Sequence, residues 1–254
     1  MKKHLLCGGL VVTLAAFFVS PAFAMTLSDL ETEVRIATYD TATETTRRAQ
    51  SDTVIDNLLN EAMREVVSVT WCLETSTAIT LVANTTFYAL PTNFINVSMD
   101  GGVRYENASG NTKILAQVTS RKIYQDTPDW QDKTGAPMQY FLHQDSDADP
   151  LDIAVYPIPT ATSTGTVTVQ YYFQPTSMSS DSDVPFDGFR HLYPYHMALA
   201  YKVSAQLLLT MGFAEKSTSY YNLYLGTVKM MSDRLGQMPD YNPTGRAYAP
   251  ANNR

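Results

Sequence analysis

Two clusters of aspartates are the first candidates for chemistry in this 254-residue chain. Asp145, Asp147 and Asp149 alternate with small residues, as the first ligands of an EF-hand calcium loop do. The glycine that such a loop needs at its sixth position is replaced by Pro150, and its twelfth position holds Tyr156 instead of a bidentate glutamate. We therefore expect an acidic turn between two strands rather than a calcium site.

The second acidic cluster consists of Asp181, Asp183 and Asp187, in the serine-rich connection Pro175–Gly188. Two carboxylates at a suitable distance in space hydrolyse glycosidic bonds. That distance cannot be read from the sequence, and a solvated, charged loop is the simpler interpretation. A secreted hydrolase that uses these carboxylates is the least supported of the functions considered.

Histidine and cysteine form no recognisable catalytic or metal-binding motif. His191 and His196 are five positions apart, which is about 140° around a helix, and the glutamate of an H-E-x-x-H motif is missing. His143 lies in a predicted strand without evident triad partners. Cys72 follows Trp71 in an apolar context, which favours a small buried hydrophobe over a nucleophile. The sequence therefore predicts no catalytic, cofactor-binding or metal site.

The first 24 residues have the layout of a secretory signal peptide: a basic start, an apolar run over residues 5–19 and small residues before residue 25. That run is too short to span a bilayer comfortably as a helix. Met25 follows, and residues 26–29 have the form of a helix capping box. Either the leader is cleaved or Met25 is the natural start. We favour the second, and in both cases the folded part should begin at Met25.

The charge of the chain argues against tight binding of nucleic acid through phosphates. There are 18 Lys and Arg against 25 Asp and Glu, and Lys2 and Lys3 lie in the leader, so residues 25–254 carry 16 against 25, a net charge of −9. Proteins that grip phosphates carry a basic excess instead. The 16 tyrosines, against two tryptophans, suit half-hydrated subunit interfaces, although a tyrosine-rich β domain would have the same composition.

Apolar residues recur at helical spacing in four segments. Thr26 should cap the first helix, the second should cover about Ser51–Ser68, and two more should cover about Phe189–Met211 and Ala214–Leu235. In the second helix a polar face of Asp52, Asn60 and Arg64 should lie opposite the apolar stripe that includes Val54 and Ile55. The residues expected to face inward in the last two helices are Leu192, Tyr195, Leu199, Val203 and Leu207, and then Tyr221, Leu225, Val228, Met231 and Leu235.

Between residues 71 and 174 the pattern changes to short alternating or β-branched runs, separated by turn residues. A short helix is expected over Thr119–Gln125. Short strands at this spacing indicate a small barrel or a sandwich. The expected strands are Thr77–Val82, Phe87–Leu90, Ile95–Met99, Lys113–Val118, Met138–His143, Leu151–Tyr156 and Thr166–Phe173.

The element order predicts an α+β protein. The N-terminal and C-terminal helix pairs should form one helical bundle, with an antiparallel β-barrel or sandwich domain inserted between them. The expected segments are a signal-peptide-like leader (1–24), N-terminal helices (25–70), a β domain (71–175), an acidic linker with the C-terminal helix pair (176–236) and an extended tail (237–254).

A series of weak motifs follows a fixed order through the second half of the chain. In chain order they are Pro128-Asp129-Trp130, Gly135-Ala136-Pro137 before Tyr140, Leu151-Asp152-Ile153, Tyr156-Pro157-Ile158-Pro159, Val169-Gln170-Tyr171-Tyr172, Asp181-Ser182-Asp183-Val184-Pro185 and the helix start from His191 to Ala200. None is specific alone. Their order, together with the N-terminal helices, resembles the head-to-tail adaptor proteins of tailed bacteriophages over most of Met25–Gly236.

This resemblance implies a structural virion protein without enzymatic activity or cofactor. Members of the family form a ring, usually a dodecamer, beneath the portal protein. The ring lines the DNA channel without sequence-specific DNA contacts, receives the tail or nozzle proteins, and assembles in the host cytoplasm without a membrane. The main alternative accepts the leader at face value: an exported module, periplasmic or secreted, that binds carbohydrate or peptide through its tyrosine-rich faces.

Overall fold

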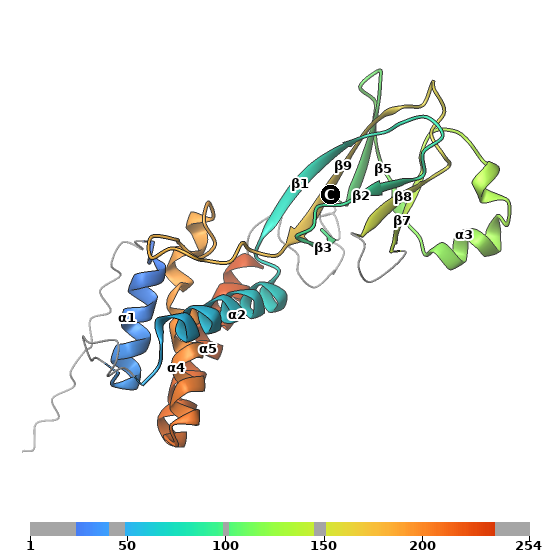
Figure 1. Cartoon of the computed structure of the whole chain (residues 1–254). Coiled ribbons are helices and arrows are strands. Elements are labelled where there is room, and N and C mark those ends of the chain that lie inside the picture. Colours follow the sequence, from blue (N-terminus) through green and yellow to red (C-terminus); the bar gives the residue numbers. More distant parts are fainter. Residues whose placement is uncertain (1–23, 41–48, 99–101, 145–150, 237–254) are drawn as a thin grey trace, which may run out of the picture.

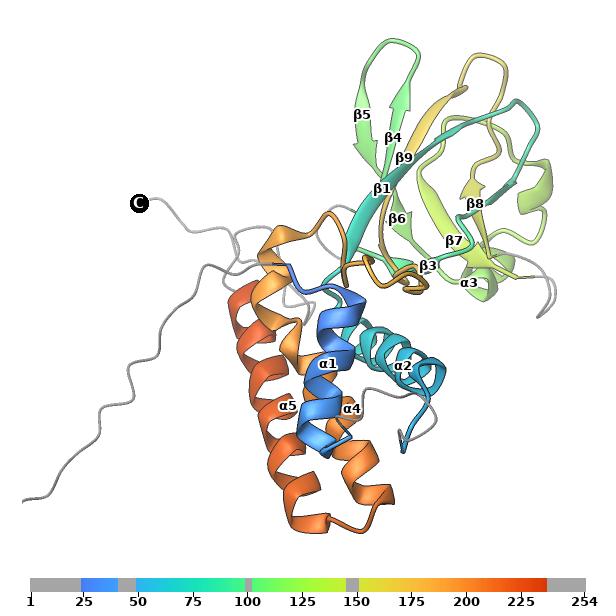
Figure 2. The same cartoon turned by 60° about the vertical axis from the view of Figure 1, so that its left-hand side comes forward.

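The computed structural model describes residues 24–40, 49–98, 102–144 and 151–236, and it shows an α+β protein in two parts, a helical body and a β lobe (Figures 1 and 2). Residues 1–23 of the leader, the tail 237–254 and the aspartate cluster Asp145, Asp147 and Asp149 lie outside the described residues.

The helical body combines helices from both ends of the chain. It contains α1 (Leu27–Thr38), α2 (Asp52–Thr70), α4 (Met197–Thr210) and α5 (Ala214–Leu235). Helix α4 contacts each of the other three, and one apolar core joins all four. Leu30, Leu59 and Leu199, from three different helices, are completely buried in this core.

Side-chain caps begin the two N-terminal helices, and the sequence predicts the one at Thr26. The Oγ1 of Thr26 accepts a hydrogen bond from the Asp29 N–H at 3.3 Å, and the Asp29 carboxylate accepts one from the Thr26 N–H at 2.9 Å. These reciprocal bonds confirm the capping box and satisfy donors that the first helical turn leaves without partners. Ser51 caps α2 in a similar way, through the N–H of Val54.

The segment before α4 differs from its prediction. A single helix is expected over Phe189–Met211, but Arg190–Tyr195 form a 3₁₀ helix (η3) and the α-helix starts only at Met197. Pro194 lies inside η3, and a proline has no N–H to donate and clashes with the preceding turn of an α-helix. At the other end of α4, Gly212 has a φ of +85°, which suits a residue just past the end of a helix.

The β lobe consists of two sheets, and within the described residues neither closes into a barrel. All strand pairs are antiparallel except β6 with β7. The first sheet has the order β1 (Glu74–Thr80), β9 (Gly165–Phe173), β4 (Val103–Asn107) and β5 (Thr112–Ile114), with β3 (Phe94–Val97) also paired to β9; the second has the order β2 (Phe87–Ala89), β8 (Asp152–Tyr156), β7 (Gln139–His143) and β6 (Ala116–Gln117).

The two sheets share one apolar core. Val103 and Val167 of the first sheet and Val155 of the second are completely buried in it. The short helix α3 (Ser120–Asp126), close to its predicted range, lies beside the second sheet, where Trp130 is buried against Phe141. Trp130 belongs to a short 3₁₀ helix, η2 (Trp130–Asp132).

The strand expected over Lys113–Val118 is two strands, β5 and β6, which belong to different sheets, and the sequence does not predict β4. Its inward residues, Val103 and Tyr105, are buried, while Arg104 and Glu106 point to solvent. The partner strand β9 passes very close to it, since a Cβ on Gly165 would lie 2.1 Å from the carbonyl oxygen of Glu106. A side chain at residue 165 would therefore force the two strands apart.

The β lobe is joined to the helical body by two neighbouring strands. The chain enters the lobe through β1 and returns through β9, and Glu74 of β1 is paired with Tyr172 of β9. The N–H of Phe173 donates to the Leu73 carbonyl at 3.1 Å, and the rings of Trp71 and Tyr172 pack edge to face at 5.1 Å. Figure 1 shows these two connections side by side.

Candidate interaction surface

The candidate nucleophile Cys72 and the candidate base His143 both pack against neighbouring side chains as structural residues. Cys72 is buried, as predicted, and burial raises the pKa of its thiol to about 12, so the thiolate nucleophile does not form at neutral pH. His143 on β7 packs its ring against the rings of Phe87 and Phe141, at centroid distances of 4.9 and 6.4 Å.

His196 connects the starts of two helices. It is completely buried at the beginning of α4, and its Nδ1 accepts a hydrogen bond from the backbone N–H of Met25 at 3.1 Å. Burial lowers the pKa of the imidazole to about 4, and the bond from Met25 requires Nδ1 to be unprotonated. His191, in η3, is exposed. Among the described residues, no group of three or more His, Cys, Asp or Glu side chains is placed to hold a metal ion.

The acidic linker cluster acts as an external cap on α1. The backbone carbonyls of Asp183 and Asp181 accept hydrogen bonds from the N–H groups of Leu27 and Ser28, at 2.8 and 3.2 Å. The Asp183 carboxylate accepts the N–H groups of Ser179 and Ser180, and these bonds lower its pKa. The cluster is thus a charged turn whose backbone fixes the first turn of α1.

Asn60 corrects the predicted polar face of α2. It is buried, not exposed, because the linker lies over it. Its amide donates to the Met178 carbonyl and accepts the Met178 N–H, so both backbone groups of Met178 have a partner. The periodicity of α2 alone contains no sign that a segment more than a hundred residues away covers this position.

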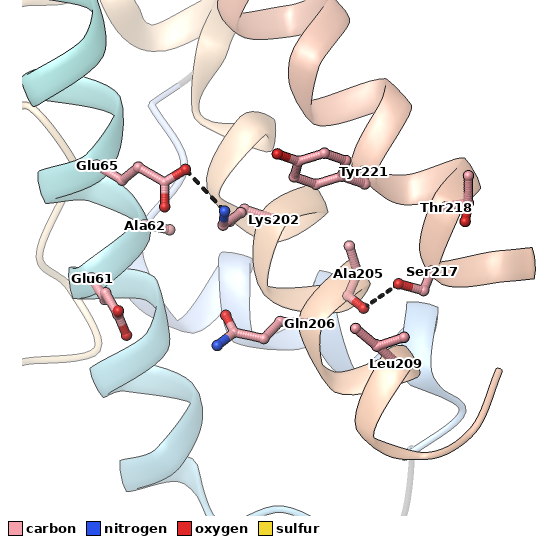
Figure 3. A pocket seen from close by; sticks show the side chains of 10 residues that line it. All are labelled: Glu61, Ala62, Glu65, Lys202, Ala205, Gln206, Leu209, Ser217, Thr218 and Tyr221. Carbon is pink, nitrogen blue, oxygen red and sulfur yellow. Dashed lines mark hydrogen bonds and ion pairs between the residues drawn. The ribbon is translucent and has the colours of Figure 1, made fainter. Parts of the chain in front are cut away.

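A groove of about 450 Å³ lies between α2, α4 and α5 (Figure 3). Helix α2 supplies one wall, α4 the floor and α5 the other wall. The residues that line it are Glu61, Ala62, Glu65, Lys202, Ala205, Gln206, Leu209, Ser217, Thr218 and Tyr221.

A polar network holds the upper part of the groove together. Glu65 Oε1 accepts hydrogen bonds from Lys202 Nζ and from the Tyr224 hydroxyl, both at 2.9 Å. The Lys202 ammonium also lies 5.3 Å from the ring centroid of Tyr221 and 5.1 Å from that of Tyr224, within cation–π range. Burial and the bond to Glu65 raise the pKa of Tyr224. Three helices are thereby fixed relative to one another at this point.

Deeper in the groove, a second bond joins α4 to α5. The hydroxyl of the buried Ser217 donates to the Ala205 carbonyl at 2.7 Å. The groove walls are therefore held by side chains of the chain itself. Lys202 is the one member of this site with a signal in the sequence, a single cation within the apolar helix Met197–Thr210.

Three apolar side chains of α5 and α2 are exposed, contrary to the sequence-based prediction, and one of them, Tyr221, lines the groove. Val228, Met231 and Leu235 of α5 are buried as predicted, but Tyr221 and Leu225 are 42% and 46% exposed, and Tyr224 is buried in their place. Val54 on α2, also predicted to be buried, is 41% exposed. Exposed apolar groups that gather on one surface are typical of interaction sites.

The similarity of this chain to known proteins extends over nearly its whole length and is not limited to the groove. In the part of the chain that the structure describes, no helix is long and apolar enough to cross a membrane. A family model described as SU10 adaptor protein matches residues 25–252, which include the helical body and the β lobe. No curated protein matches the chain.

Proposed function

This chain belongs to the SU10 adaptor protein family, whose members are structural proteins of bacteriophages, and on that premise we propose that it joins the packaged head of the virion to the tail without catalysing a reaction. The observation that carries the proposal is the family match over residues 25–252, which spans both parts of the structure. The order of weak motifs in the sequence supports the same function, and both favour it over an exported binding module.

In this proposal, copies of the chain form a ring beneath the portal protein, a dodecamer as in related adaptors. The helices of residues 25–70 and 176–236 act as one bundle that packs between neighbouring copies. Residues 71–175, with two sheets packed as a sandwich, form the part that receives tail or nozzle proteins. The separation of the helical body from the β lobe in Figures 1 and 2 supports this division of roles.

The charge of the chain supports a channel through which DNA moves. Residues 25–254 carry a net charge of −9, with 16 basic and 25 acidic residues. Tight binding to DNA depends on cationic groups that replace the counterions of the phosphates. A ring of acidic subunits offers few such groups, so packaged DNA can slide past it without being held.

The decisive experiment is native mass spectrometry and electron microscopy of the purified chain, alone and with the portal protein encoded by the same phage. We expect a discrete ring, larger than a hexamer, on each portal. Peptide mass spectrometry of purified virions should also detect the protein. A chain that stays monomeric at micromolar concentration with portal and tail proteins, and that virions lack, would disprove the proposal.

A further inference from the structure

Helix α5 carries exposed apolar residues on two opposite sides. Leu223 and Leu225 are two positions apart, which is about 200° of rotation around an α-helix. They are 50% and 46% exposed, so neither is covered by the core. Met230 lies on the side of Leu223 and is 61% exposed, whereas Tyr221 lies on the side of Leu225. The buried stripe of α5 runs between these two sides.

One side of α5, which we call the acidic flank, borders the groove. It consists of Tyr221, which lines the groove, and Leu225, one turn further along α5, with Glu61 and Glu65 of α2 across the groove. Lys202 is bonded to Glu65, and the carboxylate of Glu61 is exposed. The exposed apolar side chains of Tyr221 and Leu225 lie on the same flank as the Glu61 carboxylate. This surface suits a partner that presents apolar side chains together with cations.

The opposite side, which we call the basic flank, has the complementary chemistry. It consists of Leu223 and Met230 with Lys216 and Arg234, which lie seven positions before Leu223 and four after Met230, on the same side of the helix. Lys216 donates to the Tyr39 hydroxyl at 2.9 Å, so the exposed ring of Tyr39 extends this flank onto the end of α1. The outward strip between the flanks is polar, with Asn222, Gly226, Lys229 and Asp233.

The type of symmetry between two copies determines which flank of one copy contacts which flank of the other. A two-fold contact would pair a flank with itself, which places like charges together and leaves the other apolar flank in water. A head-to-tail contact pairs the acidic flank of one copy with the basic flank of the next, and repetition around a closed ring covers both.

We propose that the occupant of the groove is a second copy of this chain, which docks the basic flank of its α5 against the acidic flank of its neighbour. This inference rests on the proposed ring and adds the residues and the polarity of its subunit contact. Cyclic symmetry places equivalent residues of neighbouring copies at the same level along α5. Leu223 of one copy therefore packs beside Tyr221 and Leu225 of the next, and Lys216 approaches Glu61, which lies across the groove from Ser217 and Thr218.

Cysteine crosslinking on the portal complex tests this polarity. The Leu223→Cys/Leu225→Cys variant, treated with a bismaleimide, should give a ladder of covalent oligomers beyond the dimer. Each single variant alone should stay uncrosslinked, and a mixture of the two single variants should give dimers only. Wild type controls for Cys7 and Cys72, and Ile114→Cys, on an exposed residue of β5, controls for random collisions.

Matched aspartates give an independent readout. Leu223→Asp and Leu225→Asp change the same residue type at similar exposure, two positions apart on one helix, and each leaves the other flank intact. Each should lower the number of copies retained per portal, whereas Ile114→Asp should not. Glu61→Lys and Lys216→Glu should each weaken assembly by about tenfold or more, and the double variant should largely restore it.

The outcomes separate this inference from the proposed function. Rings of wild type that form on the portal, while the double cysteine variant gives no ladder or a single variant crosslinks to itself, would overturn the head-to-tail contact and leave the adaptor role intact. Wild type that forms no ring at all would contradict the adaptor role instead. Full assembly by both aspartate variants would also refute the contact.

Discussion

Asn60 and Met178 are 118 residues apart in the sequence and are joined by two hydrogen bonds, 2.9 Å from the Asn60 amide to the Met178 carbonyl and 2.7 Å from the Met178 N–H to the Asn60 carbonyl oxygen. Asparagine is the side chain that serves a backbone donor and a backbone acceptor at once from this position. The pair anchors the linker after the β lobe to the middle of α2, next to the core of the helical body.

We predict that Asn60→Ala lowers the free energy of unfolding by about 2 kcal/mol or more, because it leaves two buried backbone groups without partners. Urea denaturation followed by circular dichroism measures this loss. Asn57→Ala, an exposed asparagine on the same helix, is the matched control and should change stability little. Equal effects of the two substitutions would show that the Met178 bonds contribute nothing.

His196 makes stability depend on pH. Its pKa is lowered from 6.5 to about 4 in the folded state, so the unfolded chain binds the proton more readily. Stability from this group is present above pH 6.5 and is lost as the pH falls toward 4, by about 3 kcal/mol. Unfolding measured between pH 7 and pH 4 should show this slope in wild type and in His191→Gln. In His196→Asn, which keeps an acceptor for Met25, the slope over this window should be smaller.

Glu31 makes the stability of the fold depend on pH in the opposite direction. Burial, followed by a hydrogen bond and repulsion from Asp56, raises its pKa from 4.5 to about 8. The folded state favours the protonated form, so stability from this group is present below pH 4.5 and is lost as the pH rises through 8. Glu31→Gln should therefore be more stable than wild type at pH 8.5 and similar at pH 4.5. Glu61→Gln, an exposed control on α2, should show no such crossover.

Two glycine-to-alanine substitutions should change the free energy of unfolding in opposite directions. Gly165→Ala places a Cβ 2.1 Å from the Glu106 carbonyl oxygen and should lower the free energy of unfolding by about 1–3 kcal/mol or more. Gly226→Ala on α5 meets nothing within 4 Å and should raise it by about 0.5–1 kcal/mol, since alanine favours the helix. Thermal unfolding of both variants checks the pair, and a stable Gly165→Ala would mean that β9 can move away from β4.

The elements with a strong local signal could be predicted from the sequence. The capping box at Thr26 and Asp29 needs only adjacent residues, and the amphipathic pattern of the helices reaches over many turns. Strand β4 is not predicted because its alternating run is only a few residues long and lies between glycine-containing turns. Its assignment depends on Val103 and Tyr105 packing against strands distant in the sequence.

The interaction surface could not be derived from local patterns. Tyr221, Leu223 and Leu225 are all apolar, and periodicity does not reveal which side of α5 meets the core. Only the placement of α4 and α2 shows that Tyr224 is buried and that its neighbours are exposed. The same applies to Asn60, whose burial depends on the path of the linker.

The paired junction of β1 with β9 has a consequence for how such proteins diversify. Because Glu74 and Tyr172 are cross-strand neighbours, the lobe leaves and rejoins the helices at one point. A segment of another length or sequence could replace the lobe there without changing the path of the rest of the chain, provided that Trp71 and Tyr172 keep their ring contact. Recombination between phages could thus exchange the lobe as a cassette while the helices, with their own core, are inherited unchanged.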